Sequence, residues 1–174
     1  DARAIGAARS GNLEQARKDI AQLERIQKKL GSNKKKDQGE YDGVGDELVE
    51  ARAWLAQAEG HSDEAVRLMR SIADKEEGEA EASQGIPAHE MIGDMLLESK
   101  HPEEALVEYE ATLKSDPGRF DALYGAAQAA EQAGKHDQAN DYLAKLVKNC
   151  EGATSDRAEL KHAREVVEAR AAKN

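Results

Sequence analysis

The sequence predicts an all-α fold built from repeated helical hairpins, and two observations carry this prediction. Apolar residues form 39% of the chain and charged residues 34%, whereas aromatic residues form only 3%. Alanine, glutamate, lysine and arginine, which favour helices, supply much of this composition, and β-branched residues do not occur in the alternating runs typical of strands. The second observation is an internal repeat, in which a small residue recurs at the same distance after each predicted turn.

The repeat is clearest when "KHPEEALV" is aligned with "GKHDQAND", so that Ala105 coincides with Ala139 at an offset of 34 residues. The same register places Ala65 40 residues before Ala105, and Ala16 49 residues before Ala65. A larger apolar residue follows four positions later in each case, which puts a small and a large side chain on one helical face. Each repeat is therefore predicted to be two helices joined by a short turn.

We expect four such repeats and one further helix, together forming a single solenoid domain over residues 1–174. The repeats span residues 1–30, 46–75, 86–119 and 120–150. The first two offsets, 49 and 40 residues, are longer than the offset of 34 residues between the last two repeats. The extra residues predict a glycine-rich polar loop at 31–45 and a shorter acidic link at 76–85. Residues 155–172 carry their apolar positions on one stripe, which predicts a capping helix that covers the open end of the array.

Glycine and proline mark the ends of the expected helices. Gly11, Gly60 and Gly134 occupy the turn position of three repeats, and Lys100 occupies it in the other. Pro87 and Pro102 stand where first helical positions are expected, since a missing N–H is harmless there.

Small residues explain how the hairpins could pack. Antiparallel helices approach closely only where a side chain leaves room, so a larger residue at the crossing would cost roughly 1–3 kcal/mol. Each first helix carries one small residue midway, and each second helix carries one five positions after the turn. These packing positions are Ala4, Ala16, Ala53, Ala65, Gly93, Ala105, Ala127 and Ala139.

This arrangement of small residues, a following large apolar residue and a closing proline resembles the tetratricopeptide repeat. Residues 86–119 match best, with Gly93, Ala105, Tyr109 and Pro117 all in frame. The resemblance implies a right-handed superhelix of stacked hairpins that binds other proteins and has no catalytic residues. The chain also resembles the C-terminal part of longer bacterial tetratricopeptide proteins without an assigned activity, and we expect further repeats before Asp1.

Charge and motifs exclude several other classes. The formal charge of −10 disfavours binding to nucleic acid, and no apolar stretch is long enough for a membrane span. "HEMIG" begins like a zinc-protease helix, but Gly93 stands where the second histidine must be. We therefore expect no catalytic residue, no metal and no cofactor, and the compartment is left open between cytoplasmic and exported.

In the family that the repeats resemble, residues beside the small position of the first helix tend to face a concave groove. Projecting that frame gives an acidic surface with a few apolar anchors, which predicts a basic peptide as ligand. The alternative is that Trp54 packs between adjacent repeats and the carboxylates form a solvated face. The projected positions are Glu47, Glu50, Trp54, Glu90, Asp94, Leu97, Glu98, Asp121, Tyr124, Gln128 and Glu131.

The sequence thus favours a non-enzymatic protein-interaction module or scaffold. An alternative is a structural spacer or terminal cap of a longer array with no ligand of its own. Lys34, Lys35 and Lys36 form a basic segment that is either a solvated loop or the contact for weak self-association through an acidic groove. The partner and the oligomeric state are not predicted.

Overall fold

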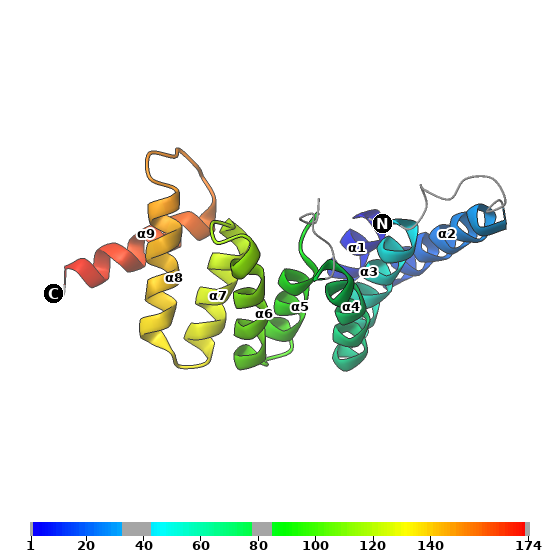
Figure 1. Ribbon diagram of the computed structural model, residues 1–174, viewed down its shortest axis with the longest axis horizontal. Helices are drawn as coiled ribbons and strands as arrows, with labels where there is room; N and C mark the ends of the chain where they lie inside the picture. The colour runs from blue at the N-terminus through cyan, green and yellow to red at the C-terminus, as the bar shows by residue number, and fades with distance from the viewer. Residues whose placement is uncertain (1, 33–42, 78–84, 173–174) are drawn as a thin grey trace. The chain divides into compact units, whose positions relative to one another are not determined.

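The computed structural model describes residues 2–32, 43–77 and 85–172 (Figure 1). Within these ranges the chain forms nine α-helices and no strand, which confirms the predicted all-α helical-repeat fold. The helices are α1 (Ala2–Arg9), α2 (Leu13–Ser32), α3 (Gly43–Ala58), α4 (Ser62–Glu76), α5 (Ala88–Glu98), α6 (Pro102–Ser115), α7 (Phe120–Gln132), α8 (His136–Asn149) and α9 (Ala158–Ala171). In the described part of the chain, no helix is both long enough and apolar enough to cross a membrane.

The same turn joins the two helices of every hairpin. Each turn has one residue with a positive φ, namely Gly11, Gly60, Lys100 (φ 66°) and Gly134. The following N–H donates to a carbonyl five residues back, as in His61 to Ala56 and His101 to Leu96, both at 2.9 Å. This is the bond that ends a helix with a left-handed residue. Lys100 therefore takes the conformation that glycine takes elsewhere.

The chain divides into two compact units, Asp1–Glu81 and Ala82–Asn174. Within the first unit α1 packs against α2, α2 against α3 and α3 against α4, and α1 also contacts α3. Within the second unit the same holds from α5 through α9. Sequential packing of hairpins is thus present in both units. A single right-handed superhelix over residues 1–174 stays a prediction.

All eight predicted packing positions are buried, four in each unit. In the first unit Ala4 belongs to a cluster with Ile20, Leu48 and Ala51. In the second unit Ala127 packs with Leu143 and with Leu160 of α9. The small residues therefore lie where neighbouring helices approach one another.

Tyr109 of α6 shows why some of these positions must be small. Its ring is 1% exposed and lies against Gly93 of α5 and Gly125 of α7. A Cβ at Gly93 would stand 2.9 Å from ring atoms of Tyr109, and one at Gly125 would stand 2.5 Å from Cζ. The Tyr109 hydroxyl donates to Asp94 Oδ1 at 2.7 Å. One buried aromatic thus fills the space that two glycines leave.

Several predicted boundaries differ from the structure. Helix α2 continues to Ser32 and α3 begins at Gly43, so both described ends of the predicted 31–45 loop are helical. Gly31 and Ser32 have low intrinsic helix propensity, so their inclusion in the last turn of α2 could not be predicted from composition. Pro102 begins α6 as predicted, whereas Pro87 precedes the first residue of α5. The basic segment Lys34–Lys36 lies outside the described residues.

Candidate binding site

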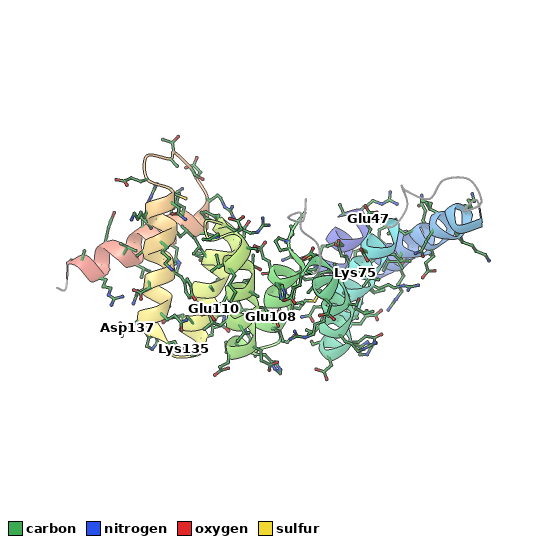
Figure 2. The ribbon with its side chains drawn as sticks, in the orientation of Figure 1. Glu47, Lys75, Glu108, Glu110, Lys135 and Asp137 are labelled. Carbon is green, nitrogen blue, oxygen red and sulfur yellow. The ribbon has the colours of Figure 1, made fainter. Side chains whose placement is uncertain are left out.

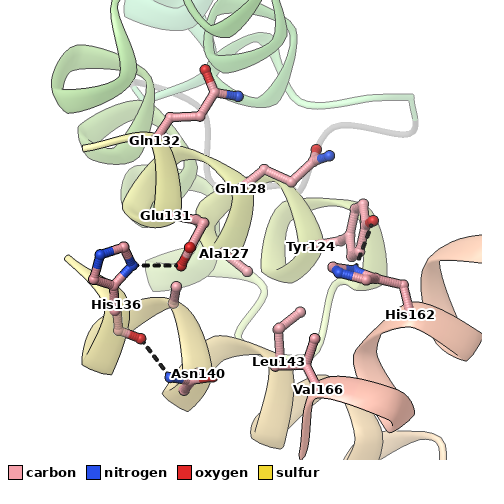
Figure 3. Close-up of a pocket in the computed structure, with 11 residues that line it drawn as sticks. Tyr124, Ala127, Gln128, Glu131, Gln132, His136, Asn140, Leu143, His162 and Val166 are labelled. Atoms are coloured by element: carbon pink, nitrogen blue, oxygen red, sulfur yellow. Dashed lines mark hydrogen bonds and ion pairs between the residues drawn. The ribbon is translucent and has the colours of Figure 1, made fainter. Parts of the chain in front are cut away.

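A pocket of about 530 Å³ lies among α7, α8 and α9 in the second unit (Figure 3). Apolar side chains form part of the lining, and amide and ionisable side chains form the remainder. We call it the α7–α9 pocket. Its lining residues are Tyr124, Ala127, Gln128, Glu131, Gln132, His136, Ala139, Asn140, Leu143, His162 and Val166.

The pocket exists because small residues occupy the crossing of α7 and α8. Ala127 and Ala139 are each 3% exposed and both line the pocket. Leu143, one helical turn after Ala139, supplies a larger apolar surface, and Val166 contributes another from α9. Helix α9 itself is held to α8 by the buried Leu160 and Ala163. The residues that allow the hairpin to close therefore also make an apolar floor.

One pair of aromatic rings connects α7 with α9. The Tyr124 hydroxyl lies 3.2 Å from His162 Nδ1, and the two rings meet edge to face with centroids 5.9 Å apart. Burial, with the charge of Glu159 second, raises the pKa of Tyr124. This pair fixes the distance between the two walls along one side of the pocket (Figure 3).

Arginine side chains fix both ends of α9. Arg157, which precedes α9, donates to Asp121 at 2.6 Å, and its guanidinium lies 3.9 Å from the ring centroid of Phe120. Near the other end, Arg170 donates to Asp137 of α8 at 3.1 Å. These exposed contacts orient α9 so that His162 and Val166 face the pocket.

The other end of the pocket carries an ion pair. Glu131 Oε2 lies 3.0 Å from His136 Nδ1, and both side chains are mostly exposed. The hydrogen bond with Glu131, followed by its charge, raises the pKa of His136. The His136 carbonyl also accepts a hydrogen bond of 2.8 Å from the amide of Asn140. The start of α8 is thus tied to the end of α7 (Figure 3).

The structure brings together only part of the predicted groove. Tyr124, Gln128 and Glu131 share one face of α7 and all line the pocket. Asp121 lies on the same helix but is paired with Arg157. Leu97 is half-buried and Asp94 accepts the Tyr109 hydrogen bond.

Glu90, a predicted groove residue, has an internal partner. Its side chain is 5% exposed and forms two hydrogen bonds with Arg119, at 2.6 and 3.1 Å. A carboxylate paired inside the protein cannot receive a ligand without breaking that pair. Glu90 as a ligand contact therefore stays a prediction, and its carboxylate already has a partner inside the second unit.

Trp54, another predicted groove residue, is buried in the first unit. Its ring is 2% exposed, and the Arg9 guanidinium of α1 lies 4.5 Å from the ring centroid. The contact between Trp54 and Arg9 agrees with the alternative, in which the ring packs between adjacent repeats. Glu50 is half-buried, and burial, followed by the charges of Glu47, Glu76 and Asp46, raises its pKa.

Other carboxylates of the second unit also have internal partners. Glu108 and Glu110 both belong to α6 (Figure 2). Glu108 is buried, and its carboxylate lies 2.7 Å from His89 Nδ1. Glu110 accepts hydrogen bonds from Tyr142 at 2.7 Å and Gln138 at 2.8 Å. Among the described residues no group of three potential ligands could hold a metal ion.

The predicted groove positions all came from the first helix of each repeat. For this reason the residues that α8 and α9 contribute to the pocket were not predicted. His136 has the ordinary composition of a turn, and His162 and Val166 belong to a helix predicted only to cover the end of the array. Val166 does follow Leu160 and Ala163 along the apolar side of α9. That one additional apolar position is the only signal in the sequence that could have indicated a wall.

Hairpins packed in sequence, with small buried residues at each crossing, define a helical-repeat protein. Within this class, residues 96–149 match the model of the tetratricopeptide repeat family. This segment covers the end of α5, then α6, α7 and α8, so the predicted resemblance is confirmed there. Comparison with curated proteins finds no match.

Proposed function

We propose that the chain is a non-enzymatic protein-interaction module, and that its α7–α9 pocket binds an extended peptide segment of another protein. Tetratricopeptide repeats and their helical-repeat fold are typical of proteins that bind other proteins. The observation that carries the proposal is the composition of the pocket, which combines an apolar floor with amide groups at its rim.

The floor suits an aliphatic side chain of the ligand. Ala127, Ala139, Leu143 and Val166 offer apolar surface without a charged group among them. Burying one leucine or isoleucine side chain is worth about 1.5–3 kcal/mol. Part of this free energy offsets the loss of motion on binding, so a single anchor gives weak, reversible association.

The rim suits the backbone of the ligand. Gln128, Gln132 and Asn140 each carry a side-chain amide that can both donate and accept hydrogen bonds. An extended peptide presents alternating N–H and C=O groups, which need partners of both kinds when water is excluded. Amide side chains on two facing helices meet that requirement without selecting a sequence.

The charge of the second unit favours a basic ligand. Residues 82–174 contain 17 acidic and 11 basic residues, a net formal charge of −6. Among the described lining residues, Glu131 is the carboxylate, and none is lysine or arginine. A segment with lysine or arginine near an aliphatic residue is therefore the ligand that we propose, and electrostatic attraction speeds its association.

The test is a peptide array probed with the 174-residue chain. The peptides carry one leucine and one lysine at varied spacing in an alanine–serine background, and matched series replace lysine by glutamine or glutamate. We expect the lysine series to bind best, and Val166→Asp to abolish binding. Val167→Asp is the matched control, because Val167 is the next residue of α9, also partly buried, but does not line the pocket.

The alternative function, a structural spacer or cap without a ligand, predicts a different result. Carboxylates such as Glu90, Asp121 and Asp137 are paired within the chain, which favours this alternative. It predicts that no peptide of any series binds, and that Val166→Asp and Val167→Asp change only stability. Circular dichroism of both variants separates a loss of folding from a loss of the pocket.

A further inference from the structure

The ion pair at the rim differs from the other ion pairs around the pocket. Glu131 is near the end of α7 and His136 begins α8, on either side of the turn that contains Gly134. Both side chains line the pocket, with exposed fractions of 62% for Glu131 and 67% for His136. The carboxylate can therefore be reached from the pocket and from the histidine at the same time.

The partner of Glu131 is what sets it apart. Asp121 is paired with Arg157, Asp137 with Arg170 and Glu90 with Arg119. An arginine keeps its charge at every physiological pH and holds a carboxylate with a planar fork. A histidine loses its charge near neutral pH, so it is the partner that is most readily replaced.

We infer that Glu131 is the residue that binds the cationic side chain of the ligand, a lysine or arginine, and that this cation takes the place of His136. The inference rests on the proposed function, because it names the part of the ligand that the same pocket selects. Glu131 then determines specificity for charge, whereas the apolar floor determines specificity for size.

The exchange has a consequence for protons. While Glu131 is paired with His136, the raised pKa keeps the imidazole protonated at a higher pH than usual. When the ligand's ammonium or guanidinium group occupies Glu131, the imidazolium loses its carboxylate and its pKa returns toward the ordinary value. In the interval between these two values, binding releases a proton to solvent.

Other charged and titratable groups lie near Glu131 and His136. Lys135 and Asp137 flank His136 at the turn (Figure 2). The charge of Asp137 also raises the pKa of His136, and Asp137 is itself paired with Arg170 of α9. Tyr124 and His162 pair with each other on the α7 and α9 walls, and Glu110 of α6 is bonded to Gln138 and Tyr142 of α8. Asp137, Tyr124, His162 and Glu110 therefore each have a partner other than Glu131, and the exposed Lys135 does not line the pocket.

The experiment is calorimetric titration of the chain with the tightest lysine peptide of the array, at about pH 6 and about pH 8. Measurements in two buffers with different ionisation enthalpies count the protons released. We expect binding to tighten by about two- to fivefold between these pH values, as befits an exposed pair. The matched glutamine peptide should show neither the tightening nor the proton release.

Two variants test the exchange directly. Glu131→Gln should remove both the preference for lysine and the pH dependence. His136→Ala should bind the lysine peptide at about pH 6 as tightly as the unmodified chain does at about pH 8, because nothing then competes for Glu131. A residue with a merely structural role would not strengthen binding when it is removed.

The matched control is His101→Ala. His101 pairs with Glu104 at 3.1 Å, is similarly exposed and also lies at the turn of a hairpin, but it does not line the pocket. It should leave affinity and proton release unchanged. Peptide binding that is equal for lysine and glutamine, or a pH dependence that survives Glu131→Gln, overturns this inference and leaves the proposed function standing. No binding by any peptide overturns both.

Discussion

The Cα of Gly125 in α7 lies so close to the ring of Tyr109 in α6 that a Cβ there would be 2.5 Å from Tyr109 Cζ. Distances below 3.0 Å are essentially never found for real Cβ atoms. The contact joins two consecutive repeats of the second unit. The size of a side chain at residue 125 therefore controls how closely α7 can approach α6.

Gly125→Ala should reduce the free energy of unfolding. Alanine favours a helix over glycine by about 1 kcal/mol, but overpacking against Tyr109 costs roughly 1–3 kcal/mol or more. The net effect should be destabilising. Denaturant unfolding measures it, and Gly6→Ala is the control, because Gly6 is helical and nothing lies within 4 Å of a Cβ there. The control should stabilise, and equal effects at both positions would contradict the reported contact.

Lys100→Gly should raise the melting temperature. Lys100 has φ 66°, and a residue with a Cβ loses roughly 1–2 kcal/mol in this conformation. Glycine avoids that strain but has more freedom when unfolded, so we expect a gain of about 0.5–1 kcal/mol. Gly134→Ala, at the equivalent turn with φ 73°, should lower the melting temperature instead. A loss of stability in Lys100→Gly would show that the lysine side chain contributes more than its backbone strain costs.

Arg119→Ala should be strongly destabilising, because it leaves the buried Glu90 carboxylate without its partner. Removing one member of a buried ion pair typically costs about 3–5 kcal/mol. The matched control is Arg157→Ala, which breaks the exposed pair with Asp121 and should cost less than about 1 kcal/mol. Both values come from chemical denaturation at neutral pH. Similar losses for the two variants would mean that burial does not distinguish the pairs.

The His136 ring should titrate above its ordinary pKa, because Glu131 raises it. A raised folded pKa means that the pair stabilises the protein fully below the ordinary value of 6.5 and that this stabilisation is lost as the pH rises through the raised pKa. Proton NMR of the imidazole measures the value, and Glu131→Gln should lower it. An unchanged titration in that variant would contradict the ion pair.

The hydroxyl of Tyr142 should ionise at a higher pH than an ordinary tyrosine. Burial, followed by the hydrogen bond with Glu110, raises the pKa of Tyr142 to about 12. Because the unfolded chain ionises near the ordinary value of 10.0, stability should decline as the pH rises above that value. Ultraviolet absorbance during alkaline titration detects the phenolate, and Glu110→Gln should bring the pKa down.

Spacing in the sequence was sufficient to predict the hairpins. Ala65, Ala105 and Ala139 recur at a fixed distance after a turn, and a repeat of that kind specifies both the helices and their crossings. Even the odd position, Lys100, forms the same turn as glycine, because the hydrogen bonds of the hairpin impose the backbone conformation. Gly125 was not predicted as a packing position because no other repeat has an equivalent glycine. It is small because the ring of Tyr109 occupies the space beside it.

The site was less predictable, because periodicity identifies a helical face but not the residue that covers it. Trp54 is covered by Arg9, 45 positions earlier, and Glu90 is held by Arg119, 29 positions later. Neither partner belongs to the repeat pattern. The projection put Tyr124, Gln128 and Glu131 on one face of α7, and all three line the pocket, but the pocket also needs α9. Its contribution follows from packing on α8, which a one-dimensional pattern does not contain.

Tyr109 lies between Gly93 and Gly125, so it couples the unfolding of two consecutive repeats. If α5 separates from α6, the ring loses one wall, and water then reaches the surface that α7 also covers. The two hairpins should therefore open in a single cooperative step, with backbone amides of α5, α6 and α7 exchanging hydrogen for deuterium at similar rates. Repeat proteins usually allow their terminal hairpins to fray one by one, and this shared aromatic ring removes that freedom from the α5–α7 segment.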